Sequence, residues 1–276
     1  MSETNFIEGF LSGQVAFITG GGSGINLGIA KNMAAAGAKV AICGRTFSKL
    51  ESAAEEIRAF GGDVFPVAAD VRDLEAMEKA FTESQASLGT VSIVVAGAAG
   101  NFMCEMKDMT YNGFKTVLDI DLMGSFNTAK AAYEQLKASK GSMIFISAGQ
   151  SLDAHSHQAH VSAAKAGVDK LMKTLAIEWG PEGIRANSII PGPIDGTEGM
   201  KRLTTPETLP MLINAVPARR LGSVDDIGRA AVFLSSEFAS YITGAVLPVD
   251  GGLTLGGSGM FNFAAQQFGG GKKAGA

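Results

Sequence analysis

The sequence has few cysteines, no long apolar run and no targeting segment. Its two cysteines, Cys43 and Cys104, have no metal-ligand spacing between them, which favours reduced thiols over a disulfide or a zinc site. No apolar run reaches the about 20 residues of a transmembrane helix. The N-terminal MSETNFIEGF lacks signal-peptide character, and the final AGA is not a peroxisomal address. We therefore expect a soluble, cytoplasmic protein without a membrane span.

Basic residues are not in excess. Lysine and arginine number 23 against 27 acidic residues, a net charge of -4, and no basic cluster stands out, which argues against a nucleic-acid partner. The three histidines, His155, His157 and His160, lie close together without cysteines or a carboxylate cluster, so we predict no metal site. One of them could contact substrate or donate a proton; packing beside the site is the alternative.

Short β-rich runs alternate with helical segments along the chain. This alternation predicts an α/β fold, a Rossmann-like doubly wound parallel sheet with helices on both faces. With 46% hydrophobic residues and no linker, one domain over 1–255 is expected, followed by a glycine-rich tail over 256–276. The expected strands lie near 15–19, 38–43, 64–70, 91–100, 142–149, 185–193 and 245–252, and the longest expected helix near 113–141. Ligands should bind across the carboxyl ends of the strands.

The first expected strand runs directly into GGGSGINLG, residues 20–28, and then into a helical segment that ends at Gly37. Such a turn directs backbone N–H groups and a helix N-terminus at one point, and glycine lets a phosphate approach without a Cβ in the way. A glycine-rich turn can also join strand to helix for steric reasons alone. The residues after the second expected strand favour a pyrophosphate site over this alternative.

A carboxylate at the end of that second strand would bind the ribose of NAD. Here Gly44 takes that place and Arg45 supplies a planar cation, with Ser48 and Lys49 close behind. This set suits the 2′-phosphate of NADPH. The alternative is that Arg45 only caps the strand at the surface.

Five motifs occur in register at expected strand ends: TGGGSG, AADV, AGAAG, the lysine segment HVSAAKAG and PGPIDGT. With them the chain resembles the short-chain dehydrogenase/reductase family from about Ser12 to Gly252. Within that family, AAGNF at 98–102, NGFKTVLDID at 112–121 and the runs 173–203 and 239–247 are similar to the peroxisomal type of 2,4-dienoyl-CoA reductase. One departure is Asn26, where the family's turn has its third glycine; Gly28 could offset it.

The resemblance implies a bound NADPH. The turn from Gly20 to Ile25 would hold the pyrophosphate, Asp70 and Val71 the adenine, and the segment 191–197 the nicotinamide. Asp70 could also cap the next helix, although Asp73 is better placed for that. The cofactor-binding residues so implied are Gly20, Gly21, Gly22, Ser23, Gly24, Ile25, Arg45, Ser48, Lys49, Asp70, Val71, Ala98, Lys165, Pro191, Gly192, Ile194 and Thr197.

Most members of the family use Asn, Ser, Tyr and Lys as a proton relay, and only the lysine, Lys165, is kept here. The resemblance places Asp121 at the asparagine position, Ala148 at the serine position and Val161 at the tyrosine position. Asp121 with Lys165 is the pair of the peroxisomal dienoyl reductases, and we predict both as catalytic.

The missing tyrosine is intelligible for the reduction of a carbon–carbon bond. A ketone reductase must protonate an alkoxide and needs a phenol beside it. In a 2,4-dienoyl thioester, hydride adds at the far end of the diene, charge moves to the thioester oxygen, and a carbon is protonated. Lys165 would hold the nicotinamide ribose and lend positive charge, while Asp121 would order water or orient Lys165. The alternative for Asp121 is a helix cap or a pair with Lys115 or Lys130.

On the substrate side, the resemblance places Asn101 and Phe102 under an acyl chain and Tyr111 and Asn112 beside it. Arg202, and also Arg72, would meet the phosphates of CoA; each could equally be a surface arginine. Several methionines could line an adaptable acyl pocket or simply fill the core: Met103, Met106, Met109, Met200 and Met211.

We thus predict a homotetrameric enzyme, packed through the long helices carrying Asp121 and Lys165, that uses NADPH to reduce 2,4-dienoyl-CoA to 3-enoyl-CoA in unsaturated fatty acid degradation. Two alternatives stay open. One is a reductase of another enoyl or carbonyl substrate on the same fold, and the other is a catalytically silent NADPH-binding protein.

Overall fold

The computed structural model describes residues 9–258, apart from the side chains of 201–203 and 257–258. The described chain forms one seven-stranded sheet of order β3-β2-β1-β4-β5-β6-β7, with every pair parallel. The strands are β1 (Val15–Thr19), β2 (Lys39–Gly44), β3 (Val64–Ala68), β4 (Ile93–Ala96), β5 (Ser142–Ile146), β6 (Arg185–Pro191) and β7 (Val246–Val249). The strand order reverses between β1 and β4, and such a switch point opens a crevice for ligands. The predicted doubly wound α/β fold is confirmed.

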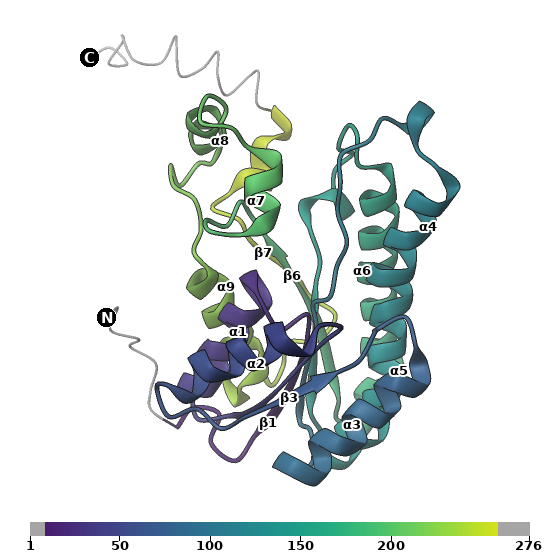
Figure 1. Ribbon diagram of the computed structural model, residues 1–276, viewed down its shortest axis with the longest axis vertical. Coiled ribbons are helices and arrows are strands. Elements are labelled where there is room, and N and C mark those ends of the chain that lie inside the picture. Colours follow the sequence, from purple (N-terminus) through teal and green to yellow (C-terminus); the bar gives the residue numbers. More distant parts are fainter. Residues whose placement is uncertain (1–8, 259–276) are drawn as a thin grey trace, which may run out of the picture.

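Helices cover both faces of this sheet (Figure 1). On one face lie α1 (Gly24–Ala35), α2 (Phe47–Arg58) and α9 (Val224–Ser235); on the other lie α3 (Leu74–Leu88), α5 (Gly124–Ser139) and α6 (Ala159–Trp179). Three shorter helices, α4 (Tyr111–Leu118), α7 (Glu198–Leu203) and α8 (Leu209–Ala215), stand beyond the carboxyl ends of the strands. The expected tail lies, from residue 259 onward, outside the described residues.

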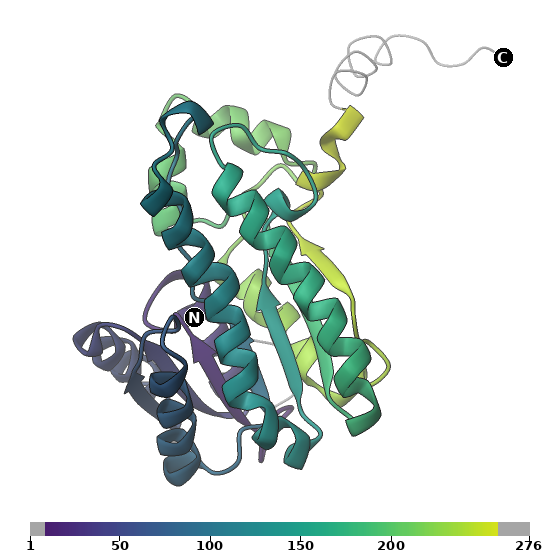
Figure 2. The ribbon, with the colours of Figure 1, turned by 90° about the vertical axis from the view of Figure 1, so that its right-hand side faces the viewer.

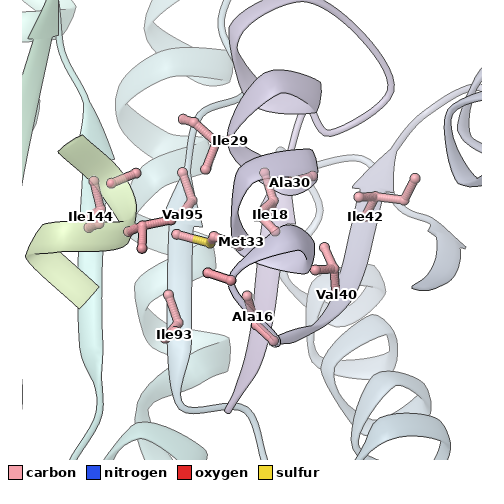
Figure 3. Close-up of a cluster of buried hydrophobic side chains, with 14 of the residues drawn as sticks. Ala16, Ile18, Ile29, Ala30, Met33, Val40, Ile42, Ile93, Val95 and Ile144 are labelled. Carbon is pink, nitrogen blue, oxygen red and sulfur yellow. The ribbon is translucent and has the colours of Figure 1, made fainter. Parts of the chain in front are cut away.

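Alternating side chains of the strands supply the two cores. Ile18 of β1 pairs in register with Ile42 and Val95, and all three pack with Ile29 and Met33 of α1 (Figure 3). The neighbouring β1 residue points to the opposite face, because strand side chains alternate; there Phe17 stacks on Phe81 of α3 with ring centroids 4.0 Å apart. Both faces of the central strands are thus buried, as expected for a parallel sheet covered by helices.

The helix expected over 113–141 is not regular throughout. Between α4 and α5 the chain makes a π-helical turn over Asp119–Met123, in which the Gly124 N–H bonds to the Asp119 carbonyl. A Cβ on Gly124 would lie 2.6 Å from Val71 Cγ2, so the close approach of the loop after β3 requires glycine here. Such a wide turn inserts one extra residue and commonly marks a functional site. Asp121 is one of the residues of this turn, and its side chain is buried.

Gly28 has a packing role. A Cβ on Gly28 would lie 2.4 Å from the Cβ of Val224, because α1 crosses α9 closely at this point. The residue predicted to offset Asn26 thus serves the contact between two helices. Within residues 9–258, no helix is long and apolar enough to cross a membrane.

Candidate active site

A large cavity of about 1920 Å³ opens along the carboxyl ends of β1, β4, β5 and β6. Its walls run from the glycine turn after β1 to α7 and α8. Small-molecule sites commonly have volumes of roughly 300–1,000 Å³, so this cavity has room for a dinucleotide together with a second ligand. The predicted position of the ligand site, across the strand ends, agrees with this cavity.

The glycine turn lies at one end of the cavity. Gly20, Ser23, Gly24 and Ile25 line the wall, and Ser23 precedes the first residue of α1 without capping it through its side chain. The N–H groups of the first helical turn therefore keep their capacity to bind an anion. Gly24 has φ +56° and open space where a Cβ would stand, so the turn can take a phosphate close to its backbone.

Two other glycines of the turn, Gly21 and Gly22, pack against β2 and α2 and do not line the cavity. A Cβ on Gly21 would lie 2.9 Å from Ile42, and one on Gly22 would lie 3.3 Å from Leu50. The Gly21 N–H bonds to the Cys43 carbonyl at 3.2 Å. These two residues, predicted as cofactor contacts, hold the turn against β2 and α2 behind the cavity wall.

Arg45 lies on the cavity wall directly after β2, with Gly44 beside it. Ser48 and Lys49, in the first turn of α2, do not line the cavity. Asp70 and Val71 line it after β3. The predicted cation therefore stands at the strand end where a carboxylate would otherwise bind a ribose.

Asp70 and Arg72 are joined in a close pair. The guanidinium donates to both carboxylate oxygens, with Nε at 3.0 Å from each and Nη2 at 2.5 Å from Oδ2, and the Arg72 backbone N–H also donates to Oδ1 at 3.0 Å. These hydrogen bonds lower the pKa of Asp70, and the charge of Arg45 acts in the same direction. Arg72, predicted to meet CoA, is instead bound to Asp70 and does not line the cavity. The helix cap belongs to Asp73, whose side chain accepts from the Ala76 N–H at 3.1 Å.

The nicotinamide end of the predicted site is also on the wall: Ala98, Pro191, Gly192, Ile194 and Thr197. Thr197 donates to the Ile194 carbonyl at 2.8 Å and accepts from the Met200 N–H at 3.3 Å, so it caps α7. Gly192 is required by the approach of β7, since its Cβ would lie 2.6 Å from the Cα of Asp250.

The predicted catalytic pair meets on the wall of the cavity. Asp121 is 0% exposed, and one of its oxygens lies 3.2 Å from the Lys165 Nζ. The other oxygen accepts the Gly100 N–H at 2.7 Å, and Lys165 donates to the Ile146 carbonyl at 2.9 Å. A buried charge is tolerated when it is paired and hydrogen-bonded in this way. Lys115 pairs with Asp119 instead, so the alternative pairing of Asp121 with Lys115 is wrong.

The two relay positions that lack a hydroxyl are on the wall as well. Ala148 follows β5, and Val161, 3% exposed, packs with Val117 and Ala164. An aliphatic side chain thus stands where a phenol would have to be. The cavity wall here offers the charge of Lys165 rather than a hydroxyl of the relay.

The predicted substrate residues do not all reach the cavity. Asn101 lines it, whereas Phe102 packs against His160 in a tilted arrangement with ring centroids 4.3 Å apart. Tyr111, 79% exposed, and Asn112 begin α4 and lie off the cavity wall. Arg202 belongs to α7, and its side chain lies outside the described part of the chain. The segment between β4 and α4 is mostly irregular, so sequence spacing could not fix these directions.

The three histidines diverge. His155 lines the cavity, His157 lies 3.5 Å from a Glu105 oxygen, and His160 is 0% exposed. Burial lowers the pKa of His160, while the charge of Asp121 and the backbone of Phe102 oppose that shift. No group of three or more potential metal ligands converges in residues 9–258.

Two side chains of the site carry roles that the sequence did not predict. Asn26 lines the cavity and donates to the Gly97 carbonyl at 2.8 Å, joining the glycine turn to the end of β4. Its substitution for the family's glycine was visible in the sequence and was the available signal. Gln158, at the start of α6, bonds to residues of two other loops; nothing in the sequence distinguished it.

Comparison with known proteins gives the same class. A family model described as enoyl-(acyl carrier protein) reductase matches residues 20–254. The chain belongs to the short-chain dehydrogenase/reductase family, as its motifs predicted.

Within that family the relatives include dienoyl reductases. The peroxisomal 2,4-dienoyl-CoA reductase of Saccharomyces cerevisiae, which is (3E)-enoyl-CoA-producing, is 44% identical over 92% of this chain and 88% of that protein. A probable 2,4-dienoyl-CoA reductase of Bacillus subtilis, (2E)-enoyl-CoA-producing, is 38% identical over 88% of this chain and 97% of that protein. Among solved structures, a gluconate 5-dehydrogenase from Burkholderia cenocepacia in complex with NADP and tartrate is 31% identical, with a TM-score of 0.83 over 89% of this chain and 96% of that chain.

Proposed function

We propose that this protein uses NADPH to reduce the conjugated diene of 2,4-dienoyl-CoA thioesters. The observation that carries the proposal is the buried Asp121–Lys165 pair on the cavity wall, with aliphatic residues at both hydroxyl positions of the relay. The dienoyl reductases among the relatives support the same substrate class.

The residues present fit a nicotinamide dinucleotide phosphate. The turn with Gly24 offers backbone N–H groups beside open space, and Arg45 stands on the wall at the ribose end. Because Gly44 brings no carboxylate there, Arg45 can attract a 2′-phosphate, and the Asp70 carboxylate on the same wall is paired with Arg72. The NADP complex of a structural neighbour is consistent with this choice.

Lys165 is the group that can respond to charge on the substrate. An ammonium has three hydrogens; Ile146 accepts one and Asp121 lies in ion-pair contact, so a further hydrogen can serve a ribose hydroxyl or the thioester. NADPH, when bound, supplies the hydride. As charge moves onto the thioester oxygen, the fixed cation of Lys165, which is 6% exposed, stabilises that charge more than solvent would. Asp121 keeps the Lys165 Nζ in place.

In the last step of the reaction, a carbon atom of the substrate is protonated. Hydride at C5 leaves an electron pair spread over the dienolate, and a proton from water completes the product. Protonation at C2 gives the 3-enoyl thioester, and protonation at C4 gives the 2-enoyl thioester. We propose the 3-enoyl product, which is the product named for the yeast relative.

The test is NADPH oxidation by the purified protein with 2,4-hexadienoyl-CoA, compared with crotonyl-CoA and acetoacetyl-CoA. We expect turnover with the diene alone, and NMR of the product will locate its double bond. Turnover only with acetoacetyl-CoA would make the protein a carbonyl reductase with another proton donor. Binding of NADPH without turnover of any thioester would make it a silent binding protein, a candidate favoured by the loss of three relay residues.

We also propose a homotetramer packed through α4, α5 and α6. Met123 in the π-helical turn, Phe126 in α5 and Ile177 in α6 are 46%, 41% and 78% exposed, and α4 and α6 lie side by side (Figure 2). Light scattering after gel filtration measures the mass of the assembly, and Ile177→Glu should reduce that mass.

We also propose a cytoplasmic location. Imaging of a fluorescent fusion tests it against the peroxisomal location in the yeast relative's name.

A further inference from the structure

Gln158 is a buried amide at the start of α6 that does not cap the helix. It directly precedes α6, where a side chain usually caps the helix, yet it makes no cap bond. The residue is buried, with 3% of its surface exposed. A buried amide must find hydrogen-bond partners, and Gln158 finds them on two other loops at the strand ends.

Three amide side chains form a chain of hydrogen bonds. Gln150, in the loop after β5, donates through Nε2 to the Gln158 oxygen. Gln158 in turn donates through Nε2 to the Asn101 oxygen at 3.1 Å, and its nitrogen lies 3.2 Å from the Met103 sulfur. Both ends of this chain, Gln150 and Asn101, line the cavity, whereas Gln158 does not.

The chain of amides has a direction. Each link donates toward Asn101, so the Asn101 oxygen is held as an acceptor and points at Gln158. The polar group that Asn101 can offer to the cavity is then its nitrogen. An amide nitrogen carries two hydrogens, so it can keep one partner in the protein and still donate to a ligand.

Asn101 is also placed next to the catalytic pair. The preceding residue, Gly100, donates its N–H to Asp121 at 2.7 Å. The following residues are held against the start of α6, since the Phe102 ring packs against His160 and the Cys104 N–H bonds to the His157 carbonyl at 3.0 Å. Asn101 is therefore fixed on both sides along its backbone, and Gln158 fixes its side chain.

We propose that Gln158 is a positioning residue that directs the Asn101 amide nitrogen at the carbonyl oxygen of the thioester substrate. The inference rests on the proposed function, because it needs a thioester carbonyl in the cavity. Where negative charge develops on that oxygen, a fixed donor adds to the charge of Lys165. Asn101 touches the substrate, and Gln158 acts only through it.

The test is a double-mutant cycle of Gln158→Met and Asn101→Ala, measured as kcat and KM with 2,4-hexadienoyl-CoA. Methionine keeps the length of the side chain and removes both links of the amide chain. We expect Gln158→Met to lower kcat by about tenfold or more with the KM for NADPH unchanged. In the Asn101→Ala background the same substitution should lower kcat by less than about twofold, because residues that act as one unit are not additive.

Gln158→Glu tests the direction of the chain. The carboxylate still accepts from Gln150 but repels the Asn101 oxygen, so the Asn101 amide turns over and presents its oxygen to the cavity. We expect kcat to fall at least as far as in Gln158→Met. Gln158→Glu also serves in the cycle if Gln158→Met does not fold.

Gln135→Met is the matched control. Gln135 is half-buried and, like Gln158, bridges two segments, accepting from the Val91 N–H at 2.9 Å and donating to the Phe81 carbonyl at 3.2 Å, but it does not line the cavity. Gln135→Met should lower the melting temperature and leave kcat unchanged. Affinity for hexanoyl-CoA in the presence of NADP⁺, from calorimetry, gives a readout that needs no turnover and should show the same coupling.

The outcomes separate the two proposals. Turnover by the wild type, with equal losses from Gln158→Met in both backgrounds, would overturn the role of Gln158 and leave the proposed function intact. No turnover and no binding of any thioester by the wild type would overturn the proposed function and, with it, this inference. A small effect in the Asn101→Ala background alone supports the positioning role.

Discussion

The two ends of the cavity are built by different means. The cofactor end consists of backbone: a glycine turn, the first turn of α1 and one cation, Arg45, on the wall. The other end consists of buried side chains that hold one another, an ion pair between Asp121 and Lys165 and a chain of three amides. Backbone binds any phosphate that fits, whereas a network of side chains can be matched to the charge that one reaction develops. The backbone-built end therefore suits any dinucleotide cofactor of this class, whereas the side-chain network determines which reaction the site can support.

The largest effect should come from breaking the ion pair. Asp121→Ala leaves the Lys165 charge buried without its partner and removes the acceptor of the Gly100 N–H. We expect kcat/KM with the dienoyl thioester to fall by about 10²–10⁴-fold, and the free energy of unfolding by about 3–5 kcal/mol. Steady-state kinetics and urea unfolding measure the two losses.

The control lies two residues away. Asp119 lies in the same π-helical turn and forms a partly exposed ion pair with Lys115 of α4. Asp119→Ala removes this pair and should change the free energy of unfolding by less than about 1 kcal/mol, with kcat unchanged. Equal losses of activity in both variants would mean that the π-helical turn, and not the Asp121 carboxylate, is what matters.

The next largest effect is expected where Asn26 of the glycine turn meets Gly97 at the end of β4. A Cβ on Gly97 would stand 2.1 Å from the Asn26 Oδ1, so Gly97→Ala must displace the Asn26 amide and its bond to the Gly97 carbonyl. We expect a loss of about 1–3 kcal/mol and weaker NADPH binding, measured by chemical denaturation and by fluorescence titration. Asn26→Gly should restore both in the double variant, because it removes the clashing amide.

Gly180→Ala is the control for this substitution, since φ is -54° there and nothing lies within 4 Å of its Cβ. It should be neutral or stabilise the fold by about 0.4–1 kcal/mol. If Asn26→Gly fails to rescue Gly97→Ala, the clash lies with the backbone of the turn and not with the amide.

A smaller and more selective effect is expected at the cofactor end. Arg45→Ala should raise the KM for NADPH by about 10–100-fold and hardly change that for NADH, because only the 2′-phosphate meets the guanidinium. Lys49→Ala, off the cavity wall, should raise the KM for NADPH by less than about threefold. An equal loss for both cofactors in Arg45→Ala would show that Arg45 supports the turn and does not read the phosphate.

The smallest effect concerns pH and the buried imidazole beside the substrate end. Burial lowers the pKa of His160 in the folded protein, so below about pH 6.5 the unfolded chain takes up a proton that the folded chain does not. Stability therefore falls as the pH drops through that range. His160→Phe should flatten this dependence in urea unfolding between pH 7.5 and 5.5. His155→Phe, at an exposed position, should leave it unchanged; an equal flattening would refute the assignment to His160.

Most residues predicted for the cofactor end line the cavity, whereas Asn101 is the one predicted substrate residue that the described wall contains. The wall residues Gly20, Ser23 and Gly24 follow from a local rule, since a turn between a strand and a helix binds phosphate through atoms that every residue has. Asn101, Phe102 and Tyr111 come from one stretch of chain, but only Asn101 lines the cavity. The directions of Asn101 and Phe102 depend on contacts with the start of α6, 57 residues further along the chain in the case of Asn101.

The sequence by itself determined the order of strands and helices, the glycine turn, the cation after β2 and the presence of Asp121 and Lys165 without a tyrosine. These are properties of residue type and spacing, which alternation and helix periodicity make readable. Only the tertiary structure decided that Asp121 stands on a π-helical turn, that Gly21 and Gly22 face the protein, and that Gln158 joins the loops after β4 and β5. Each of these depends on a close approach between segments far apart in sequence, where a distance of a few tenths of an ångström decides which atoms can touch.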